Sequence, residues 1–300
     1  MDQSQKIGIV TVLYNSDSVL KEFFVTLGEQ TYKNFILYVI DNKSPDNSLA
    51  LSKELALDVK FATVIIENEC NYGVAKGNNI GIKRAIEDGC DLVLLSNNDI
   101  TIERDTIENL LIGLETRKAD MAVPKIYFYD TIKIWAAGGY FQKSTGHTLH
   151  YGMREDDIGQ YDNERQVGYA PTCFMLIRNE VFEHVGFMDE NYFVYYDDSD
   201  FVYRALNKFN KRLWYVPSSL VHHKESTSTG QMSDFSVKYL SRNIVYFSLK
   251  NYSLLYALYV ILLNFFYTFF VLYFKWPRQK WSLSLKSYIE GFKLYIKRVE

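Results

Sequence analysis

The chain has 300 residues, enough for one large domain or two small ones, and its 23% charged and 48% hydrophobic residues exclude a disordered chain. The net charge of −3 hides an asymmetry: residues 241–300 hold nine Lys or Arg and two acidic residues, whereas residues 1–240 hold 24 and 34. Because this basic tail is also very apolar, it favours an anionic membrane surface as a partner and argues against nucleic acid.

The cysteines and the N-terminus indicate the compartment. Cys70, Cys90 and Cys173 are odd in number and lack zinc-binding spacing, so we expect reduced thiols. The first residues show no basic and then apolar leader, so we expect no secretion signal. Together with the basic tail, this predicts a cytoplasmic protein at the inner face of the cell membrane.

The first 120 residues alternate between two patterns. Continuous apolar runs predict strands, and apolar residues spaced by three and four predict helices. The expected strands are 6–14, 35–41, 62–68 and 91–97, and the expected helices are 16–30 with Ser16 as its cap, 47–56, 75–89 and 103–118. This alternation predicts an α/β fold with a doubly wound, mostly parallel sheet.

The pattern is mixed after Ala119. Strands are expected at 134–142, 169–178 and 212–217, the last stopped by Pro217, with helices at 179–185 and 198–209 and a polar loop or hairpin at 144–166. We therefore predict an α/β domain over 1–240 with two halves, 1–120 and 121–240, and a helical region over 241–300.

The helical region contains a run of 23 residues without a charge, 252–274, followed by an amphipathic segment with Lys and Arg at intervals. Three arrangements remain open, in this order of preference: a helical hairpin lying on a membrane, a membrane span, and a dimer interface. A span would place a basic flank outside the cell, against the positive-inside rule.

Polar residues follow all four predicted strands of the first half. Ligands of open α/β sheets bind beyond the carboxyl ends of the strands, so these residues predict a nucleotide site. The candidate binding residues are Thr11, Tyr14, Asn15, Asp41, Asn71, Gly73, Gly77, Asn78, Asn97 and Asn98. Glycines there would let a backbone approach phosphate near a helix N-terminus. The chain lacks both GxGxxG after its first strand and a P-loop motif, which disfavours NAD enzymes and P-loop ATPases.

The sequence Asn97-Asn98-Asp99 ends the fourth strand. Carboxylate and amide oxygens suit a hard cation such as Mg²⁺ or Mn²⁺, which is held by one or two carboxylates together with substrate phosphates. The alternative is an Asx-turn that caps the helix beginning near Glu103, with Asn98 as a turn residue.

A set of motifs in order over residues 6–250 resembles the inverting family 2 glycosyltransferases of the GT-A fold, rhamnosyltransferase-like members in particular. The motifs are VTVLYNS, VIDNKSPDNS, NYGVAKGNNIGI, the Asn-x-Asp at 97–99, TCFMLIRNEVFEHVGFMDENYFVYYDDSD and SRNIVYF. The resemblance implies a Rossmann-like catalytic domain over 1–240, with a nucleotide-binding half (1–120) and an acceptor-binding half (121–240). It also implies an Mg²⁺ or Mn²⁺ ion bound through Asp99. In the family a His after the last strand also contacts metal or diphosphate, which matches His223, with His222 as the fallback.

The second acidic cluster, Asp197, Asp198 and Asp200, matches the family's Glu-Asp-x-Asp. The resemblance implies that Asp198 is the general base, with Asp197 and Asp200 on the acceptor side and Arg204 able to pair with Asp200. The alternative is that these acids cap the helix that follows, favoured by its dipole.

The implied activity is transfer of one sugar, with inversion, from a nucleotide-diphosphate sugar (dTDP-rhamnose or a UDP-sugar) to a glycan or lipid-linked acceptor in cell-surface polysaccharide synthesis. The processive QxxRW signature is absent. Two other classes remain open: a sugar nucleotidyltransferase, which would need a glycine-rich basic loop after the first strand, and a non-catalytic nucleotide-sugar-binding scaffold. Contact with the membrane through 252–300 and a homodimer are also expected.

Overall fold

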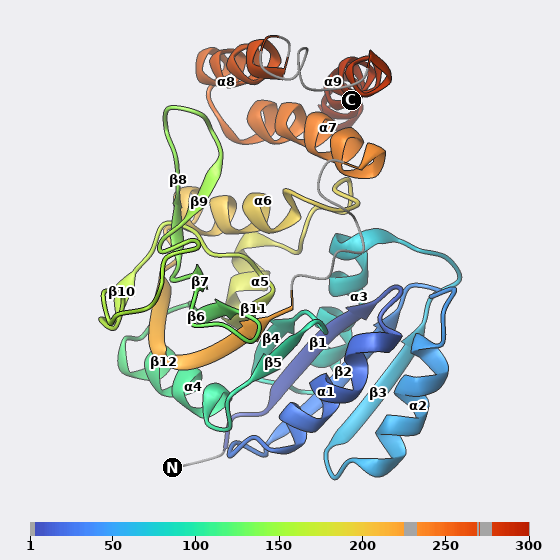
Figure 1. Ribbon diagram of the computed structural model, residues 1–300, viewed down its shortest axis with the longest axis vertical. Coiled ribbons are helices and arrows are strands. Elements are labelled where there is room, and N and C mark those ends of the chain that lie inside the picture. The colour runs from blue at the N-terminus through green and yellow to red at the C-terminus, as the bar shows by residue number, and fades with distance from the viewer. Residues whose placement is uncertain (1–3, 225–232, 269, 271–277, 300) are drawn as a thin grey trace.

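A twisted sheet with helices on both faces forms the centre of the computed structural model, which describes residues 4–224, 233–268, 270 and 278–299 (Figure 1). The first half contains, in chain order, β1 (Ile7–Leu13), α1 (Asp17–Gly28), β2 (Phe35–Asp41), α2 (Ser48–Asp58), β3 (Ala62–Glu67), α3 (Gly73–Glu87), β4 (Leu92–Ser96), β5 (Ile100–Ile102) and α4 (Thr106–Thr116). The predicted helices and long strands of this half are thereby confirmed, with small shifts of their ends.

The second half adds shorter strands and ends in three helices. Its elements are β6 (Met121–Phe128), β7 (Ile134–Ala136), β8 (Gly139–Phe141), β9 (Thr148–His150), β10 (Arg165–Gln166), β11 (Phe174–Arg178), α5 (Asn179–Val185), α6 (Asp197–Tyr203), the π-helix η1 (Arg204–Lys208), β12 (Leu213–His223), α7 (Asp234–Asn251), α8 (Leu254–Tyr267) and α9 (Arg278–Val299).

The strand order of the main sheet is β10-β12-β6-β11-β4-β1-β2-β3. The β4-β1-β2-β3 part is parallel throughout, as the alternation predicted. β11 is antiparallel to both β4 and β6, while β12 is parallel to β6. The two predicted halves therefore share one continuous sheet, and its mixed part carries the acceptor-side sequence.

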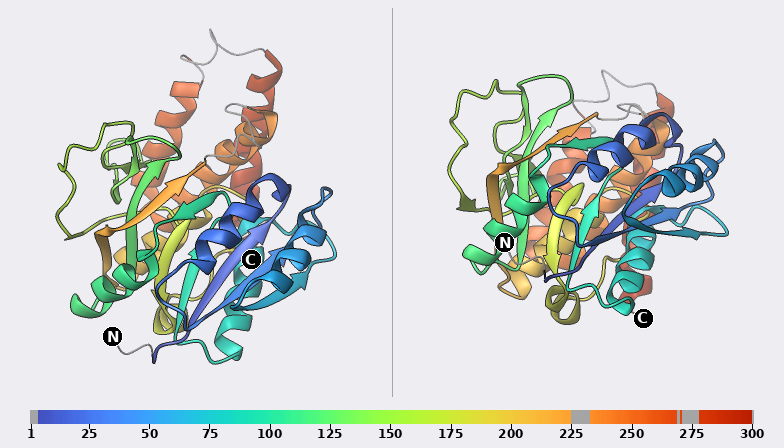
Figure 2. Two further views of the ribbon diagram at one scale, coloured as in Figure 1. Left: turned by 60° about the horizontal axis from the view of Figure 1, so that its bottom comes forward. Right: turned by 90° about the horizontal axis from the view of Figure 1, so that it is seen from below.

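Apolar side chains bury both faces of this sheet, which explains why its central strands are continuous hydrophobic runs. One core contains side chains of α1, α2 and α4, and the other contains side chains of α3, α5 and α6. Figure 2 shows α1 and α3 on opposite faces of the sheet. Helix α3 lies close on β1, because a Cβ built at Gly81 would stand 2.4 Å from a methyl of Val10. This contact fixes the start of α3 beside the end of β1.

Several elements of the second half differ from the prediction. The segments 134–142 and 169–178 form shorter strands, and β8 pairs with β9, at the start of the polar stretch 144–166, as a separate two-stranded sheet. The expectation that Pro217 ends a strand is wrong, because β12 continues to His223. A register shift between Val216 and Leu220 takes Pro217 out of the ladder, so its missing N–H costs no strand hydrogen bond.

The three C-terminal helices form a layer beyond the sheet (Figure 1). This layer begins at Asp234, a few residues before the predicted boundary at 240. Of the uncharged run 252–274, residues Leu254–Tyr267 form α8, and 269 and 271–274 lie outside the described residues. Within the described ranges, no helix has both the length and the apolar character that a membrane crossing requires.

Candidate active site

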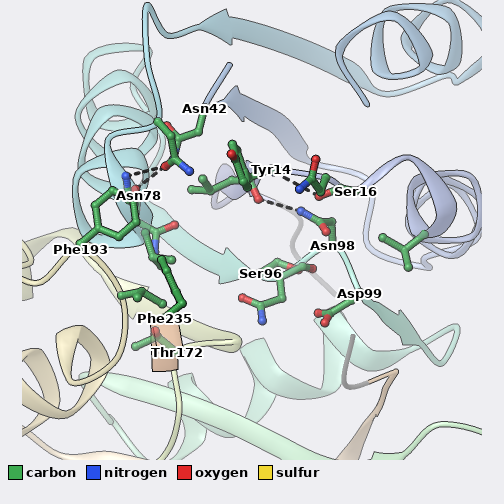
Figure 3. Close-up of a pocket in the computed structure, with 18 of the residues that line it drawn as sticks. Tyr14, Ser16, Asn42, Asn78, Ser96, Asn98, Asp99, Thr172, Phe193 and Phe235 are labelled. Carbon is green, nitrogen blue, oxygen red and sulfur yellow. Dashed lines mark hydrogen bonds between the residues drawn. The ribbon is translucent and has the colours of Figure 1, made fainter. Parts of the chain in front are cut away.

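A cavity of about 260 Å³ lies at the carboxyl ends of β1 and β4, next to the start of α3 (Figure 3). Its lining is Val12, Tyr14, Asn15, Ser16, Ser18, Val19, Asn42, Asn71, Gly73, Val74, Asn78, Ser96, Asn97, Asn98, Asp99, Thr172, Phe193, Val194 and Phe235. Four strand ends or strand-to-helix loops of the first half thus meet here, in the place where open α/β sheets bind ligands.

Eight predicted residues line this cavity: Tyr14, Asn15, Asn71, Gly73, Asn78, Asn97, Asn98 and Asp99. Asn42 directly follows β2 and is one of the polar strand-end residues, but it was not among the candidate binding residues, and no residue pattern pointed to Phe193 and Phe235. The two phenylalanines come from the segment before α6 and from α7, so only the tertiary structure brings them to the cavity (Figure 3).

Three candidates do not line the cavity, namely Thr11, Asp41 and Gly77. Thr11 and Asp41 are buried, and both carboxylate oxygens of Asp41 accept hydrogen bonds from the Ser44 N–H. A Cβ at Gly77 would stand 2.8 Å from a methyl of Val12. The absence of a side chain at Gly77 therefore permits packing of α3 on β1, and does not make room for a phosphate.

Side-chain amides hold the loops of the cavity in place. Asn98 Nδ2 donates to the Val12 carbonyl over 2.8 Å, which ties the end of β4 to β1. Asn42 Nδ2 donates to the Gly73 carbonyl over 3.0 Å, and the Gly73 N–H donates to Asn71 Oδ1 over 2.9 Å. The amides thus connect the ends of β1, β2 and β4 with the start of α3, so the cavity is preformed.

Asp99 lies between β4 and β5, and its Oδ1 is 3.4 Å from His223 Nε2 at the end of β12. It does not cap the next helix, because α4 begins at Thr106 with Asp105 at its N-cap. His222 Nε2 instead lies 3.2 Å from Glu103 Oε1. His223 is therefore the histidine that the fold places beside Asp99.

This pair fits a hard cation only as part of a shared site. Among the described residues no group of three His, Cys, Asp or Glu side chains is arranged to hold a metal ion. Asp99 and His223 supply one carboxylate and one imidazole beside the cavity, and Mg²⁺ or Mn²⁺ sites commonly take their remaining ligands from substrate phosphates and water. The donor set is therefore compatible with a cation that binds together with a diphosphate.

Asp198 lies in the first turn of α6, and its carboxylate is held from both sides. Oδ2 accepts a hydrogen bond of 2.6 Å from the Tyr169 hydroxyl, and Oδ1 accepts one of 2.6 Å from the Ser199 N–H. Burial, and then the charges of Asp99 and Asp198, raise the pKa of the Cys173 thiol. Both carboxylates thus lie near the same buried thiol, in the loop before β11.

A row of aromatic rings joins the two clusters. Trp135 stacks on His223 with ring centroids 4.7 Å apart, and its other neighbour is His150, also at 4.7 Å. His150 in turn stacks on Tyr169 at 5.9 Å. Trp135, His150 and Tyr169 were not predicted, because two short strands and a loop from different parts of the second half bring them together.

The three acidic residues of α6 have different environments. Burial, and then the neighbouring Asp198, raise the pKa of Asp197 to about 8. Asp200 is fully buried and accepts hydrogen bonds of 2.8 Å from Arg204 Nε and from Lys250 Nζ, and one of 2.7 Å from Asn251 Nδ2. The prediction that Asp200 contacts the acceptor is therefore wrong, whereas its pairing with Arg204 is confirmed.

A second cavity of about 670 Å³ lies between the β8–β9 hairpin, η1 and the start of α8. Its aromatic lining consists of Tyr140, Phe141, Tyr203, Tyr252 and Tyr256. Phe141 also contacts Tyr169, with ring centroids 5.4 Å apart, and Tyr169 binds Asp198. Phe141 and Tyr169 thus connect the lining of this cavity with the Asp198 carboxylate.

Comparison with known proteins identifies the class. Residues 8–186 match the family described as Glycosyl transferase family 2, and the chain belongs to this family. Its fold is that of GT-A glycosyltransferases: it superimposes on S. aureus TarS 1–349 in complex with UDP with a TM-score of 0.60 and 17% identity, over 96% of this chain and 81% of that one. It also superimposes on GalNAc-T7 with UDP, GalNAc and Mn²⁺ with a TM-score of 0.64 and 17% identity, over 81% and 48%.

The chain is also similar to dTDP-rhamnosyl transferase RfbF of Shigella flexneri, with 26% identity over 204 residues. The match covers 68% of this chain and 64% of RfbF, so it spans just under two thirds of that relative.

Proposed function

We propose that the protein is a glycosyltransferase that moves one sugar from a nucleotide-diphosphate sugar to a hydroxyl of a glycan or lipid-linked acceptor, with inversion, in polysaccharide synthesis. The observation that carries this proposal is the position of Asp198. In a family 2 chain, the Asp198 carboxylate is held by Tyr169 and Ser199, and a strand-end cavity of the same chain is lined by Asp99 and Thr172. The similarity to RfbF, named a dTDP-rhamnosyl transferase, supports dTDP-rhamnose as the first donor to test and UDP-sugars as the second.

In this mechanism the first cavity holds the donor and Asp198 acts on the acceptor. The acceptor oxygen forms a bond to C1 of the sugar while its proton passes to Asp198. The bond from C1 to the diphosphate breaks, and the diphosphate leaves with the electron pair. The Tyr169 hydroxyl and the Ser199 N–H keep the carboxylate in one orientation, which is the protein's contribution to a correctly placed general base.

Asp99 and His223 are the residues that would hold Mg²⁺ or Mn²⁺, and the ion would supply positive charge where the diphosphate leaves. The aromatic second cavity, which is connected to Asp198 through Phe141 and Tyr169, offers space for an acceptor glycan. Five aromatic rings there can pack against the apolar faces of sugar rings.

Nucleotide-sugar binding followed by turnover tests this function. The full chain is mixed with dTDP-rhamnose, a panel of UDP-sugars and free nucleotides, each with and without Mn²⁺ or Mg²⁺, and its melting temperature is measured. We expect at least one nucleotide sugar with a cation to raise the melting temperature, because a ligand that binds only the folded state stabilises it. The Asp99→Asn variant should lose the part of the shift that depends on the cation, whereas Asp105→Asn at the N-cap of α4 should keep it.

The same panel separates the competing classes. Release of free nucleoside diphosphate that requires an acceptor supports transfer. Release of pyrophosphate from a nucleoside triphosphate and a sugar phosphate would identify a nucleotidyltransferase. Binding of nucleotide sugar without turnover by any acceptor would identify a scaffold. If no nucleotide sugar shifts the melting temperature with either cation, the donor site is wrongly assigned.

A further inference from the structure

The outer side of the C-terminal helices exposes large apolar side chains. On α8, Leu255, Leu258, Leu262 and Phe266 follow one another at spacings of three and four and form one exposed stripe. Leu255 is 83% exposed and Leu262 is 53% exposed. On α9, Leu285, Ile289 and Ile296 form a second exposed stripe at spacings of four and seven. We call these two stripes together the apolar face.

The opposite sides of α8 and α9 pack against the rest of the protein, so the apolar face points away from it. Gly291 of α9 lies against the Arg242 carbonyl of α7, where a Cβ would stand 2.4 Å away, and Ser284 and Ser241 share a hydrogen bond of 2.8 Å. On α8, the Tyr256 and Tyr259 hydroxyls donate to carbonyls in the turn of the β8–β9 hairpin. Figure 1 shows α8 and α9 at the end of the molecule farthest from β3 and α2.

Positive charge borders the apolar face. The sequence of α9 contains six Lys or Arg and one Glu. Lys286, Lys293 and Lys297 are exposed and lie at spacings of seven and four, directly beside the stripe of Leu285, Ile289 and Ile296. An exposed apolar stripe flanked by lysines on one helix is the pattern of a helix that lies in the interface of an anionic bilayer.

From these features we infer that the apolar face docks the protein onto the surface of an anionic lipid bilayer, with α8 and α9 lying in the plane of the interface. Charge decides between a bilayer and a second copy of the chain. A twofold dimer through this face would bring the lysine row of α9 close to its own symmetry mate, whereas anionic headgroups neutralise it. Membrane docking goes beyond the proposed function. No residue of the apolar face lines the donor cavity.

Docking there would position the catalytic residues relative to a lipid-linked acceptor. Phe235 of α7 lines the donor cavity, and Tyr252 and Tyr256 at the start of the α8 region line the second cavity. The layer that would rest on the bilayer is therefore the one that borders both cavities. The inner face of the cell membrane, expected from the sequence, is the surface that this proposal specifies.

Vesicle sedimentation of the full chain tests the inference. Vesicles of phosphatidylcholine alone are compared with vesicles that also contain phosphatidylglycerol, at low and high salt. We expect sedimentation with the anionic vesicles that weakens with salt, and an affinity for them at least about tenfold higher than for the neutral ones. The variant Lys286→Gln/Lys293→Gln/Lys297→Gln should lose about tenfold in affinity for anionic vesicles, and Leu255→Ser/Leu262→Ser should lose binding to both kinds.

Matched variants on the catalytic part are the controls. Leu57 and Ile158 are also large exposed apolar residues, at 88% and 86%, so Leu57→Ser/Ile158→Ser should sediment like the unmodified protein. Lys21→Gln/Lys53→Gln/Lys60→Gln removes three exposed lysines of the first half and should likewise leave binding unchanged.

Two outcomes would overturn the inference. One is equal sedimentation of all variants, or none of the unmodified protein. The other is a dimer in light scattering that Leu255→Ser/Leu262→Ser converts to a monomer without any vesicle present, which would assign the face to a second copy. Nucleotide-sugar binding is measured on the same samples, so failure of the docking surface is distinguishable from failure of the proposed function.

Discussion

The two carboxylate clusters of the site are built on different principles. Asp99 belongs to a sequence of polar residues at the end of a buried strand, and the neighbouring strands of the parallel sheet place it at the cavity. Asp198 and Asp200 lie two residues apart at the start of one short helix, yet one carboxylate is held by Tyr169 next to the second cavity and the other is buried beneath Lys250. The location of the first cluster is set by strand order, whereas the roles within the second are set by packing partners from distant segments.

Of the changes to the two carboxylate clusters, removal of the Asp198 charge should have the largest effect. For Asp198→Asn we expect the transfer rate to fall about 10³-fold, roughly 4 kcal/mol in activation free energy, because an amide cannot take the acceptor proton. The melting-temperature shift given by the nucleotide sugar should stay, since the donor-side residues are intact. Single-turnover rates and thermal shifts on one preparation check both. A variant that transfers sugar at the unmodified rate would falsify the assignment of the base.

Substitution of Lys250 tests how much the buried ion pair with Asp200 contributes to stability. Its Nζ lies 2.6 Å from Asp189 Oδ2 and 2.8 Å from Asp200 Oδ2, and all three side chains are largely buried. Lys250→Met leaves two buried carboxylates with less compensation and should lower the free energy of unfolding by about 3 kcal/mol. Urea unfolding measures this loss.

The matched control for Lys250 is an exposed ion pair. Lys133→Met removes the surface pair with Asp156 and should change the unfolding free energy by no more than about 0.5 kcal/mol. A loss at Lys250 as small as that at Lys133 would mean that the C-terminal helices are not fastened to α6 through Asp200.

The raised pKa of Asp197 predicts a pH dependence of stability. Burial and the neighbouring Asp198 raise this pKa from its ordinary value of 3.8 to about 8, so between these pH values the folded state holds a proton that the unfolded state has released. The contribution of Asp197 to stability is therefore full below pH 4 and is lost as the pH rises toward 8. Asp197→Asn, which cannot ionise, should be clearly more stable than the unmodified protein at pH 8 and about equally stable at pH 4.

Unfolding curves at several pH values measure this difference. A constant offset between Asp197→Asn and the unmodified protein from pH 4 to pH 8 would show that Asp197 is ionised in the folded state, against its burial.

The smallest effect is expected at the strand-end cluster. Asn98→Ala removes the hydrogen bond to the Val12 carbonyl. It should cost about 1 kcal/mol of stability, because the carbonyl loses its donor next to the largely buried Asn98. The affinity for the nucleotide sugar should fall several-fold at the same time, since Asn98 lines the cavity. Asn163→Ala, at an exposed position in the loop after β9, is the control and should change neither urea unfolding nor thermal shift.

Much of the donor side could be predicted because it depends on local patterns. Apolar strand runs end in polar residues, and parallel strands carry these ends to one edge of the sheet, so Tyr14, Asn15 and Asp99 were found from the sequence. The exceptions are Thr11, Asp41 and Gly77, which were expected to contact a ligand but do not line the cavity. Ser44 bonds the Asp41 carboxylate, and Val12 fills the space beside Gly77. Whether a strand-end residue faces the cavity depends on side-chain packing, which periodicity does not report.

The acceptor side was predicted less well because its contacts are long-range. The motif resemblance marked Asp198, but the alternation of residue types gave no sign of Tyr169 and His150, which lie on a loop and on a three-residue strand. The continuation of β12 past Pro217 depends on a register shift against β6, and it brings His223 to Asp99. From the sequence alone, a proline in an apolar run does not show whether the strand ends there or continues after a register shift.

The sequence alone determined the α/β alternation, the family resemblance, and the basic and apolar character of the last 60 residues, because each is written in residue order at short range. The tertiary structure decided which polar residues share the cavity, which of the two histidines stands beside Asp99, and which of three neighbouring acids is buried in an ion pair. The physical reason is that burial and charge pairing are properties of a position in space, and chain segments distant in the sequence supply the partners that set them.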